Sequence, residues 1–131
     1  PSAIEKTNNN IKNAGLENII KVNRADFFKS QKMGDTPLHL LTNPPYGERI
    51  EGDINLLYKN FGDTLKRTYP NTQAWIISSN FEALKFFGLR PRRKIKLFNG
   101  KLETRLCNFP IYEGTKKIHK LRNINSKPSQ N

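Results

Sequence analysis

The fold of this chain is decided by the segment Thr42-Asn43-Pro44-Pro45-Tyr46-Gly47-Glu48-Arg49, which follows the apolar run Leu38-His39-Leu40-Leu41. An apolar run that stops at a double proline predicts a buried strand that ends in a rigid loop. Pro44 disfavours the helical region for Asn43, and the two proline rings fix the turn that follows. Ligands of open α/β sheets bind at the carboxyl ends of the strands, so we expect a stiff ligand-binding platform at this loop.

Two side chains of this platform suit a planar amine. The Asn43 amide offers a carbonyl acceptor and an NH₂ donor, and Tyr46 offers a flat aromatic face. Such groups hold an amine by hydrogen bonds at its edge and by stacking on its ring. The alternative is an ordinary strand exit with a proline-rich turn, which we consider the less favoured explanation.

The tetrapeptide Asn43-Pro44-Pro45-Tyr46 resembles the motif of amino-group methyltransferases that use S-adenosylmethionine. With Gly47-Glu48-Arg49, the run is similar to the ribosomal RNA guanine-N2 methyltransferases of the bacterial large subunit. In that family the catalytic domain usually follows an RNA-binding THUMP domain. The stretch Leu97-Phe98-Asn99-Gly100-Lys101-Leu102-Glu103 resembles the family's final hairpin.

The resemblance implies an α/β fold, the Rossmann-like class I methyltransferase fold with a closing antiparallel hairpin. The family's strand order is 3-2-1-4-5-7-6, and this chain would supply only strands 3 to 7. We therefore expect residues 1–112 to be a partial catalytic domain that is truncated at its N-terminus. Residues 113–131 are polar and basic and are expected to form a flexible tail.

Hydrophobic periodicity and capping residues predict the individual elements. They indicate helices at residues 3–14, from Asp53 to Pro70 and, capped by Asn80, at 81–87. They also indicate strands at 19–23, 38–42 and 74–78 and a hairpin that turns at Asn99-Gly100, for which the dipeptide predicts a type I′ turn.

An acid and an aromatic residue, Asp26 and Phe27, follow the predicted strand at 19–23. In the resembling family this position binds the cofactor: the carboxylate accepts from the adenine amino group, and the ring packs against the purine. The alternative is a capping aspartate beside a core phenylalanine. We favour cofactor binding by Asp26, Phe27 and Asn43, because the spacing between the two segments fits the family.

The net charge of the chain is 23 − 11 = +12, which attracts polyanions. Nucleic acid is the expected partner, although a Lys- and Asn-rich composition raises the isoelectric point of any protein. The candidate RNA-binding side chains are Arg49, Arg92, Arg93, Lys94 and Lys96. For the cluster at 92–96 the alternative is an ordinary solvated face.

Composition narrows the remaining possibilities. The chain has one cysteine and no zinc-ligand spacing, so neither an internal disulfide nor a metal site is expected. No apolar run is long enough to span a membrane, and no signal-peptide pattern opens the chain. A cytoplasmic location is expected.

The most favoured function is transfer of a methyl group from S-adenosylmethionine to the exocyclic N2 of guanine in 23S ribosomal RNA. Asn43 and the Pro44 carbonyl would accept hydrogen bonds from the amine, and Tyr46 would stack on a flipped-out base. Adenine-N6 methylation, protein glutamine-N5 methylation and a non-catalytic RNA-binding module remain alternatives. We expect the isolated chain to bind the cofactor weakly or not at all, and to self-associate or be only marginally stable.

Overall fold

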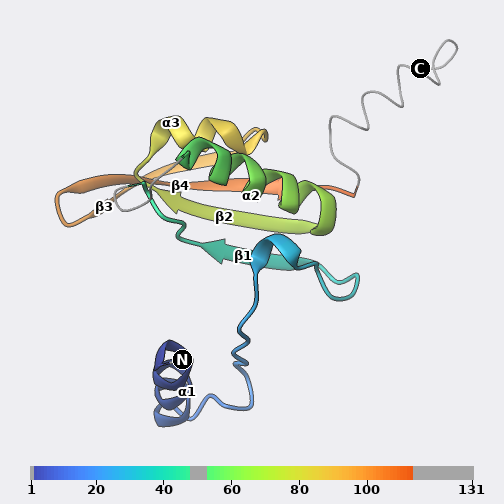
Figure 1. Ribbon diagram of the computed structural model, residues 1–131, viewed down its shortest axis with the longest axis vertical. Helices are drawn as coiled ribbons and strands as arrows, with labels where there is room; N and C mark the ends of the chain where they lie inside the picture. The colour runs from blue at the N-terminus through green and yellow to red at the C-terminus, as the bar shows by residue number, and fades with distance from the viewer. Residues whose placement is uncertain (1, 48–52, 114–131) are drawn as a thin grey trace, which may run out of the picture. The chain divides into compact units, whose positions relative to one another are not determined.

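The computed structural model describes residues 2–47 and 53–113, which divide into two units between Ser30 and Gln31. In chain order the elements are α1 (Ser2–Asn13), the 3-10 helix η1 (Phe27–Lys29), β1 (Leu38–Thr42), α2 (Ile54–Thr68), β2 (Thr72–Ser78), α3 (Phe81–Leu84), the 3-10 helix η2 (Lys85–Phe87), β3 (Arg93–Asn99) and β4 (Leu102–Ile111) (Figure 1).

In the first unit, helix α1 ends in a Schellman motif. Gly15 has a left-handed φ of 71°, its N–H donates to the Lys12 carbonyl and the Leu16 N–H donates to the Ile11 carbonyl, both at 3.0 Å. These two bonds satisfy carbonyls at the helix end, and a positive φ there favours glycine. The helix predicted at residues 3–14 is therefore confirmed.

The strand predicted at residues 19–23 is wrong. Residues 17–19 form a turn, with the N–H groups of Ile19 and Ile20 donating to the Leu16 carbonyl, and residues 20–26 are irregular. The two isoleucine residues are 76% and 42% exposed. A β-branched run becomes a strand only beside a partner that completes its hydrogen-bond ladder, and no described strand pairs with this segment.

The second unit contains a four-stranded sheet in the order β1-β2-β4-β3. Strands β1 and β2 are parallel, with Thr42 beside Ile76, whereas β4 runs antiparallel to both of its neighbours. If β1 to β4 are numbered as the family's strands 4 to 7, this order is the 4-5-7-6 part of the implied sheet. The mixed α/β fold is confirmed, with four of the five expected strands.

The closing hairpin is confirmed, but its turn differs from the predicted type. Asn99 pairs with Leu102, so the loop residues are Gly100 and Lys101. Gly100 has φ 66°, and Asn71 is the one non-glycine residue with positive φ in the described parts of the chain. Positive φ at the first loop residue alone is the pattern of a type II′ turn, not of a type I′ turn centred on Asn99-Gly100.

Aromatic packing joins the helices to one face of the sheet, on which α2 and α3 both lie (Figure 1). Phe87 of η2 is fully buried: its ring stacks on Phe109 of β4 at 5.2 Å and lies 5.5 Å from both Tyr58 and Phe61 of α2. A Cβ atom at Gly62 would collide with the Phe87 carbonyl, so the close approach of α2 and η2 requires glycine there. These contacts form the core beside the platform.

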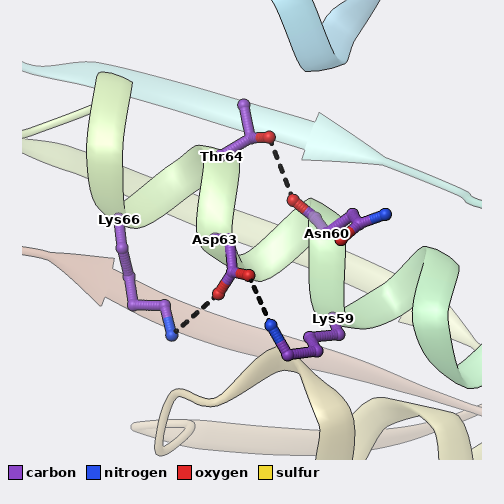
Figure 2. A network of polar contacts seen from close by, with 5 residues as sticks. All are labelled: Lys59, Asn60, Asp63, Thr64 and Lys66. Atoms are coloured by element: carbon purple, nitrogen blue, oxygen red, sulfur yellow. Dashed lines mark hydrogen bonds and ion pairs between the residues drawn. The ribbon is translucent and has the colours of Figure 1, made fainter.

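Charged and polar side chains on α2 form a network that is only partly exposed (Figure 2). Asp63 accepts from Lys59 at 2.8 Å and lies 3.4 Å from Lys66, while the Thr64 hydroxyl donates to the Asn60 carbonyl. The hydrogen bond from Lys59 holds the pKa of Asp63 below its usual value. Both ion pairs join residues within α2 itself, so the position of α2 on the sheet is set by its aromatic contacts.

The opposite face of the sheet carries apolar side chains, and neither α2 nor α3 covers it. We call this surface the open sheet face. Leu41 is 74% exposed, Leu102 41% and Leu97 37%. The strand register places the following residues on it: Leu41, Trp75, Ile77, Ile95, Leu97, Leu102 and Leu106. Within residues 31–47 and 53–113, strand β1 pairs with β2 alone, so its other edge is unpaired.

No helix in the described residues is long and apolar enough to cross a bilayer.

Candidate active site

The candidate site lies at the sheet edge where β1 and β2 end. Because these strands are parallel, their carboxyl ends meet, which brings the loop Asn43–Gly47 beside the segment Ser78–Asn80. This edge is where open α/β sheets bind ligands. The strand predicted at 38–42 is confirmed, but the expectation that it is buried is wrong: Leu41 is 74% exposed and no residue of the strand is fully buried. The predicted platform follows the strand directly.

Asn43 and Tyr46 contact each other within the loop. The Tyr46 hydroxyl donates to Asn43 Oδ1 at 2.7 Å, the Asn43 residue is exposed and Tyr46 is half-buried. This bond orients the amide and leaves Asn43 Oδ1 with a second lone pair for another donor. The pair is therefore arranged to present one acceptor and one aromatic ring to the same ligand.

The prolines and the glycine fix the backbone of the loop. Pro44 is buried and Pro45 is exposed. Gly47 has φ 106°, a conformation that side chains with a Cβ atom rarely adopt. The two proline rings therefore restrict the start of the loop, and the backbone conformation at its end favours glycine.

A chain of hydrogen bonds anchors the Pro45 carbonyl to the core. The Tyr58 hydroxyl donates to it at 2.7 Å and lies 2.8 Å from Ser78 Oγ, which in turn accepts from the Asn80 N–H at 3.0 Å. Since the single Tyr58 proton goes to the carbonyl, the Ser78 hydroxyl donates to Tyr58. Burial raises the pKa of Tyr58, which keeps this phenol protonated and able to donate.

Asn80 ties the loop to helix α3 through both ends of its side chain. Its Oδ1 accepts from the Ala83 N–H at 2.9 Å and caps α3, as predicted. Its Nδ2 donates to the Tyr46 carbonyl at 3.0 Å. Two consecutive loop carbonyls are thus held by side chains from α2 and from the end of β2.

Sequence reasoning missed the roles of Tyr58 and Ser78, and it predicted Asn80 only as a cap. The signal for Ser78 and Asn80 was present, because polar residues at the end of a buried strand beside Thr42-Asn43 must share its edge. Tyr58 carried no such signal, since in sequence it is one more aromatic residue on the apolar face of a helix.

Asp26 and Phe27 belong to the first unit. Asp26 Oδ1 accepts from the Phe28 N–H at 3.0 Å and caps η1, and the Phe27 ring meets Phe28 edge to face at 5.8 Å. The capping role that we considered as the alternative is therefore present. Asp26 and Asn43 lie in different units, so the cofactor-binding role of Asp26 stays a prediction.

The basic residues near β3 do not form a single strip. Register places Lys94 and Lys96 opposite Cys107 and Arg105, on the sheet face that carries α2 and α3, whereas Arg93 points to the open sheet face. Arg92, Arg93, Lys94 and Lys96 are all exposed. Arg49 lies outside the described residues. The described part of the chain has no group of three or more His, Cys, Asp or Glu side chains placed to hold a metal ion.

A mixed sheet with a closing antiparallel hairpin and an anchored Asn-Pro-Pro-Tyr loop at its ligand-binding edge defines the Rossmann-like methyltransferase class. The chain belongs to the RMKL-like methyltransferase domain family, whose model matches residues 1–108.

Among curated proteins, the chain is similar to the ribosomal RNA large subunit methyltransferase K/L of Syntrophotalea carbinolica, with 35% identity over 116 residues, 85% of this chain and 16% of that protein. The protein of the same name in Methylococcus capsulatus is 39% identical over 112 residues, 83% of this chain and 15% of that protein. This chain therefore spans about a sixth of the length of these relatives.

Two solved structures share the fold. SMU.472, a putative methyltransferase crystallised with SAH, superposes with a TM-score of 0.69 and 28% identity over 79% of this chain and 28% of its own. A possible methylase from Clostridium difficile 630 has the same TM-score, with 31% identity over 82% of this chain and 28% of its own. These similarities confirm the methyltransferase fold expected from the sequence.

Proposed function

We propose that this chain is part of a methyltransferase that transfers a methyl group from S-adenosylmethionine to the exocyclic N2 of guanine in large-subunit ribosomal RNA. The observation that carries the proposal is the anchored loop Asn43–Tyr46 at the carboxyl edge of the sheet. Membership of the RMKL-like family and the names of the relatives support ribosomal RNA as the substrate.

The loop suits an aromatic amine, which is a weak nucleophile because its lone pair is delocalised into the ring. Asn43 Oδ1 and the Pro44 carbonyl accept hydrogen bonds from the two amine hydrogens and favour the pyramidal form of the nitrogen. They also hold the lone pair in one direction, and orientation of this kind supplies much of an enzyme's acceleration. Tyr46 stacks on the base once it has left its helix.

The cofactor supplies an electrophilic methyl group on a sulfonium sulfur. The residues present are chemically suited to it: the Asp26 carboxylate has a second oxygen besides the one that caps η1, and this oxygen would accept from the adenine amino group. Phe27 offers a ring for the purine. After transfer, the methylated nitrogen loses one proton to solvent, so no general base is required of the loop.

The open sheet face and the unpaired edge of β1 are surfaces that a complete catalytic domain would cover. We infer that further chain of the same catalytic domain covers both, because relatives are about six times as long and an apolar face with an open edge is an aggregation liability. By the resemblance, this further chain would carry the cofactor loop and a THUMP domain. With ribosomal RNA as its substrate, the enzyme would act in the cytoplasm.

Product analysis tests the function. The complete protein is incubated with S-adenosylmethionine labelled in its methyl group and with unmodified large-subunit ribosomal RNA, and the digested RNA is analysed for modified nucleosides. N2-methylguanosine is expected. N6-methyladenosine, or label in protein glutamine, would replace the proposal by another amino-methyltransferase, and RNA binding without cofactor binding would indicate a non-catalytic module.

A further inference from the structure

A basic pocket opens beside the anchored loop, on the sheet face that carries α3. Its volume is about 470 Å³, and its lining begins at Phe81, one residue after Asn80. The pocket also includes Arg105, which pairs across the sheet with Ser78. It therefore starts at the level of the loop anchor and continues along the flank of β4.

The rim of this pocket is cationic. Lys85, Arg90, Lys94 and Arg105 line it, and none of its lining residues is acidic. Lys85 is paired with Glu82 at 3.2 Å, but both side chains are mostly exposed. Within the described residues, no ion pair is formed by the other three cations. Unpaired cations around one hollow favour an anion with several charges.

The floor of the pocket is apolar and partly aromatic. Phe81, Leu84 and Phe109 contribute to it, together with the buried Cys107. The Arg105 guanidinium carbon lies 4.0 Å from the centre of the Phe81 ring, a cation–π contact that restrains the arginine side chain. Restrained guanidinium planes and aromatic rings are the surfaces on which unpaired nucleobases stack.

We propose that this pocket binds an unpaired nucleotide of the RNA substrate that flanks the target guanine, with its base on the apolar floor and its phosphates on Lys85, Arg90 and Lys94. The inference rests on the proposed function and goes beyond it by naming the RNA contact. The interior of a duplex does not fit this arrangement, because a base there is stacked on both faces and has none free for the floor. Arg93 has no part in the contact, since it points to the opposite face of β3.

The test compares two double variants of the complete protein. Lys85→Gln/Lys94→Gln removes two charges from the pocket, and the control Lys6→Gln/Lys101→Gln removes two exposed charges, on α1 and in the β3–β4 turn, that do not line it. Binding of a single-stranded oligoribonucleotide of about ten nucleotides is titrated at several salt concentrations. The pocket variant should bind about tenfold more weakly, with the log–log salt slope reduced by about 1.4 for two lost phosphate contacts, while the control changes affinity by less than about threefold.

If both variants lose the same RNA affinity, the RNA is attracted by the overall positive charge of the protein and the pocket is not its binding site. Binding of guanosine monophosphate as tight as that of the oligonucleotide would overturn it in favour of a small-molecule site. As a measurement that needs no variant, an oligonucleotide carrying 4-thiouridine should crosslink to the peptide containing residues 81–94, and crosslinks only elsewhere would contradict the proposal.

The same preparations separate this inference from the proposed function. If Asn43→Ala abolishes methyl transfer but the pocket variant binds RNA like the wild type, the pocket is wrong and the function stands. If the wild-type protein transfers no methyl group to ribosomal RNA but the pocket variant loses RNA affinity, the function is wrong and the pocket stands.

Discussion

Two segments of this chain are similar in sequence pattern and different in structure. Leu38–Thr42 and Ile19–Asn23 are both short, β-branched or apolar runs, and each is followed by residues predicted to bind ligand. The first forms β1, paired along its length with β2. The second forms a turn and an irregular stretch whose isoleucines are exposed.

The difference lies in what each segment has beside it. β1 has a parallel neighbour within the chain, and its exit loop is held by Tyr58 and Asn80. Ile19–Asn23 has no described partner strand, and its following acid, Asp26, accepts from the Phe28 N–H and caps η1 within the same unit. Strand propensity is thus realised by partners rather than by residue type, and a binding loop is only as rigid as its anchors.

The largest expected effect is that of Asn43→Ala on the anchored side of this comparison. In the complete protein, turnover should fall by about 10²–10³, a typical loss for one group that acts on the transition state, with the melting temperature unchanged. Methyl incorporation into ribosomal RNA measures it. The control is Asn99→Ala, another exposed asparagine at a strand end, and wild-type turnover in Asn43→Ala would show that the loop is not the site.

The next largest effect is on cofactor affinity, and it concerns residues 19–26, where no described strand supports the predicted cofactor-binding residue. We expect the isolated 131-residue chain to bind S-adenosylmethionine at least about a hundredfold more weakly than the complete protein, or ~2.8 kcal/mol. Calorimetry compares the two. Affinity within about threefold of the complete protein would mean that Asp26 and Asn43 suffice, and that the comparison drawn above is wrong.

The same isolated chain should self-associate in sedimentation experiments, because its open sheet face exposes Leu41. Leu41→Lys should reduce this association. Leu56→Lys serves as the control, since Leu56 is 51% exposed on α2 and lies outside the open sheet face. If the isolated wild-type chain sediments as a stable monomer, the expected self-association is wrong.

A smaller effect is expected for Tyr58→Phe, which removes the anchor and keeps the aromatic packing. The Pro45 carbonyl and the Ser78 hydroxyl lose a partner, so stability should fall by about 1–3 kcal/mol and turnover by about tenfold. Denaturant unfolding and methyl incorporation measure the two. Tyr112→Phe, on an exposed tyrosine, controls for loss of a hydroxyl, and unchanged turnover in Tyr58→Phe would show that the loop is rigid without its anchor.

The smallest expected effect is that of Asp26→Ser. Serine keeps an N-cap but removes the carboxylate, so cofactor affinity in the complete protein should fall about fivefold while stability is kept. Asp26→Ala should lose both. Asp35→Ala, in an exposed loop, is the control. If Asp26→Ser binds the cofactor as tightly as the wild type, Asp26 does not bind the cofactor and serves only to cap η1.

Local signals predicted much of this structure, because their physics is local. Asp53 caps α2 and Asn80 caps α3 as expected, and the double proline after Leu38–Thr42 marks the strand end correctly. The type of the hairpin turn was wrong, because pairing of Asn99 with Leu102 moved the loop by one residue. Tyr58 and the division of Arg93 from Lys94 depend on tertiary packing and strand register, which no short window of sequence contains.

The hydrogen bond between Tyr46 and Asn43 has a consequence for substrate choice. Without substrate, the acceptor that the target amine requires is already engaged by a hydroxyl donor at 2.7 Å. The exocyclic amino group of an incoming guanine donates to the second lone pair of Asn43 Oδ1. Hypoxanthine, which lacks this amino group, brings no donor to this position. Because Asn43 Oδ1 keeps its hydrogen bond from Tyr46 when hypoxanthine binds, only its second lone pair stays unused, and the expected loss is that of one hydrogen bond, about 0.5–1.5 kcal/mol. On the proposed function, the Tyr46 hydroxyl therefore keeps the acceptor oriented between turnovers and lowers the penalty for a base that lacks the amino group.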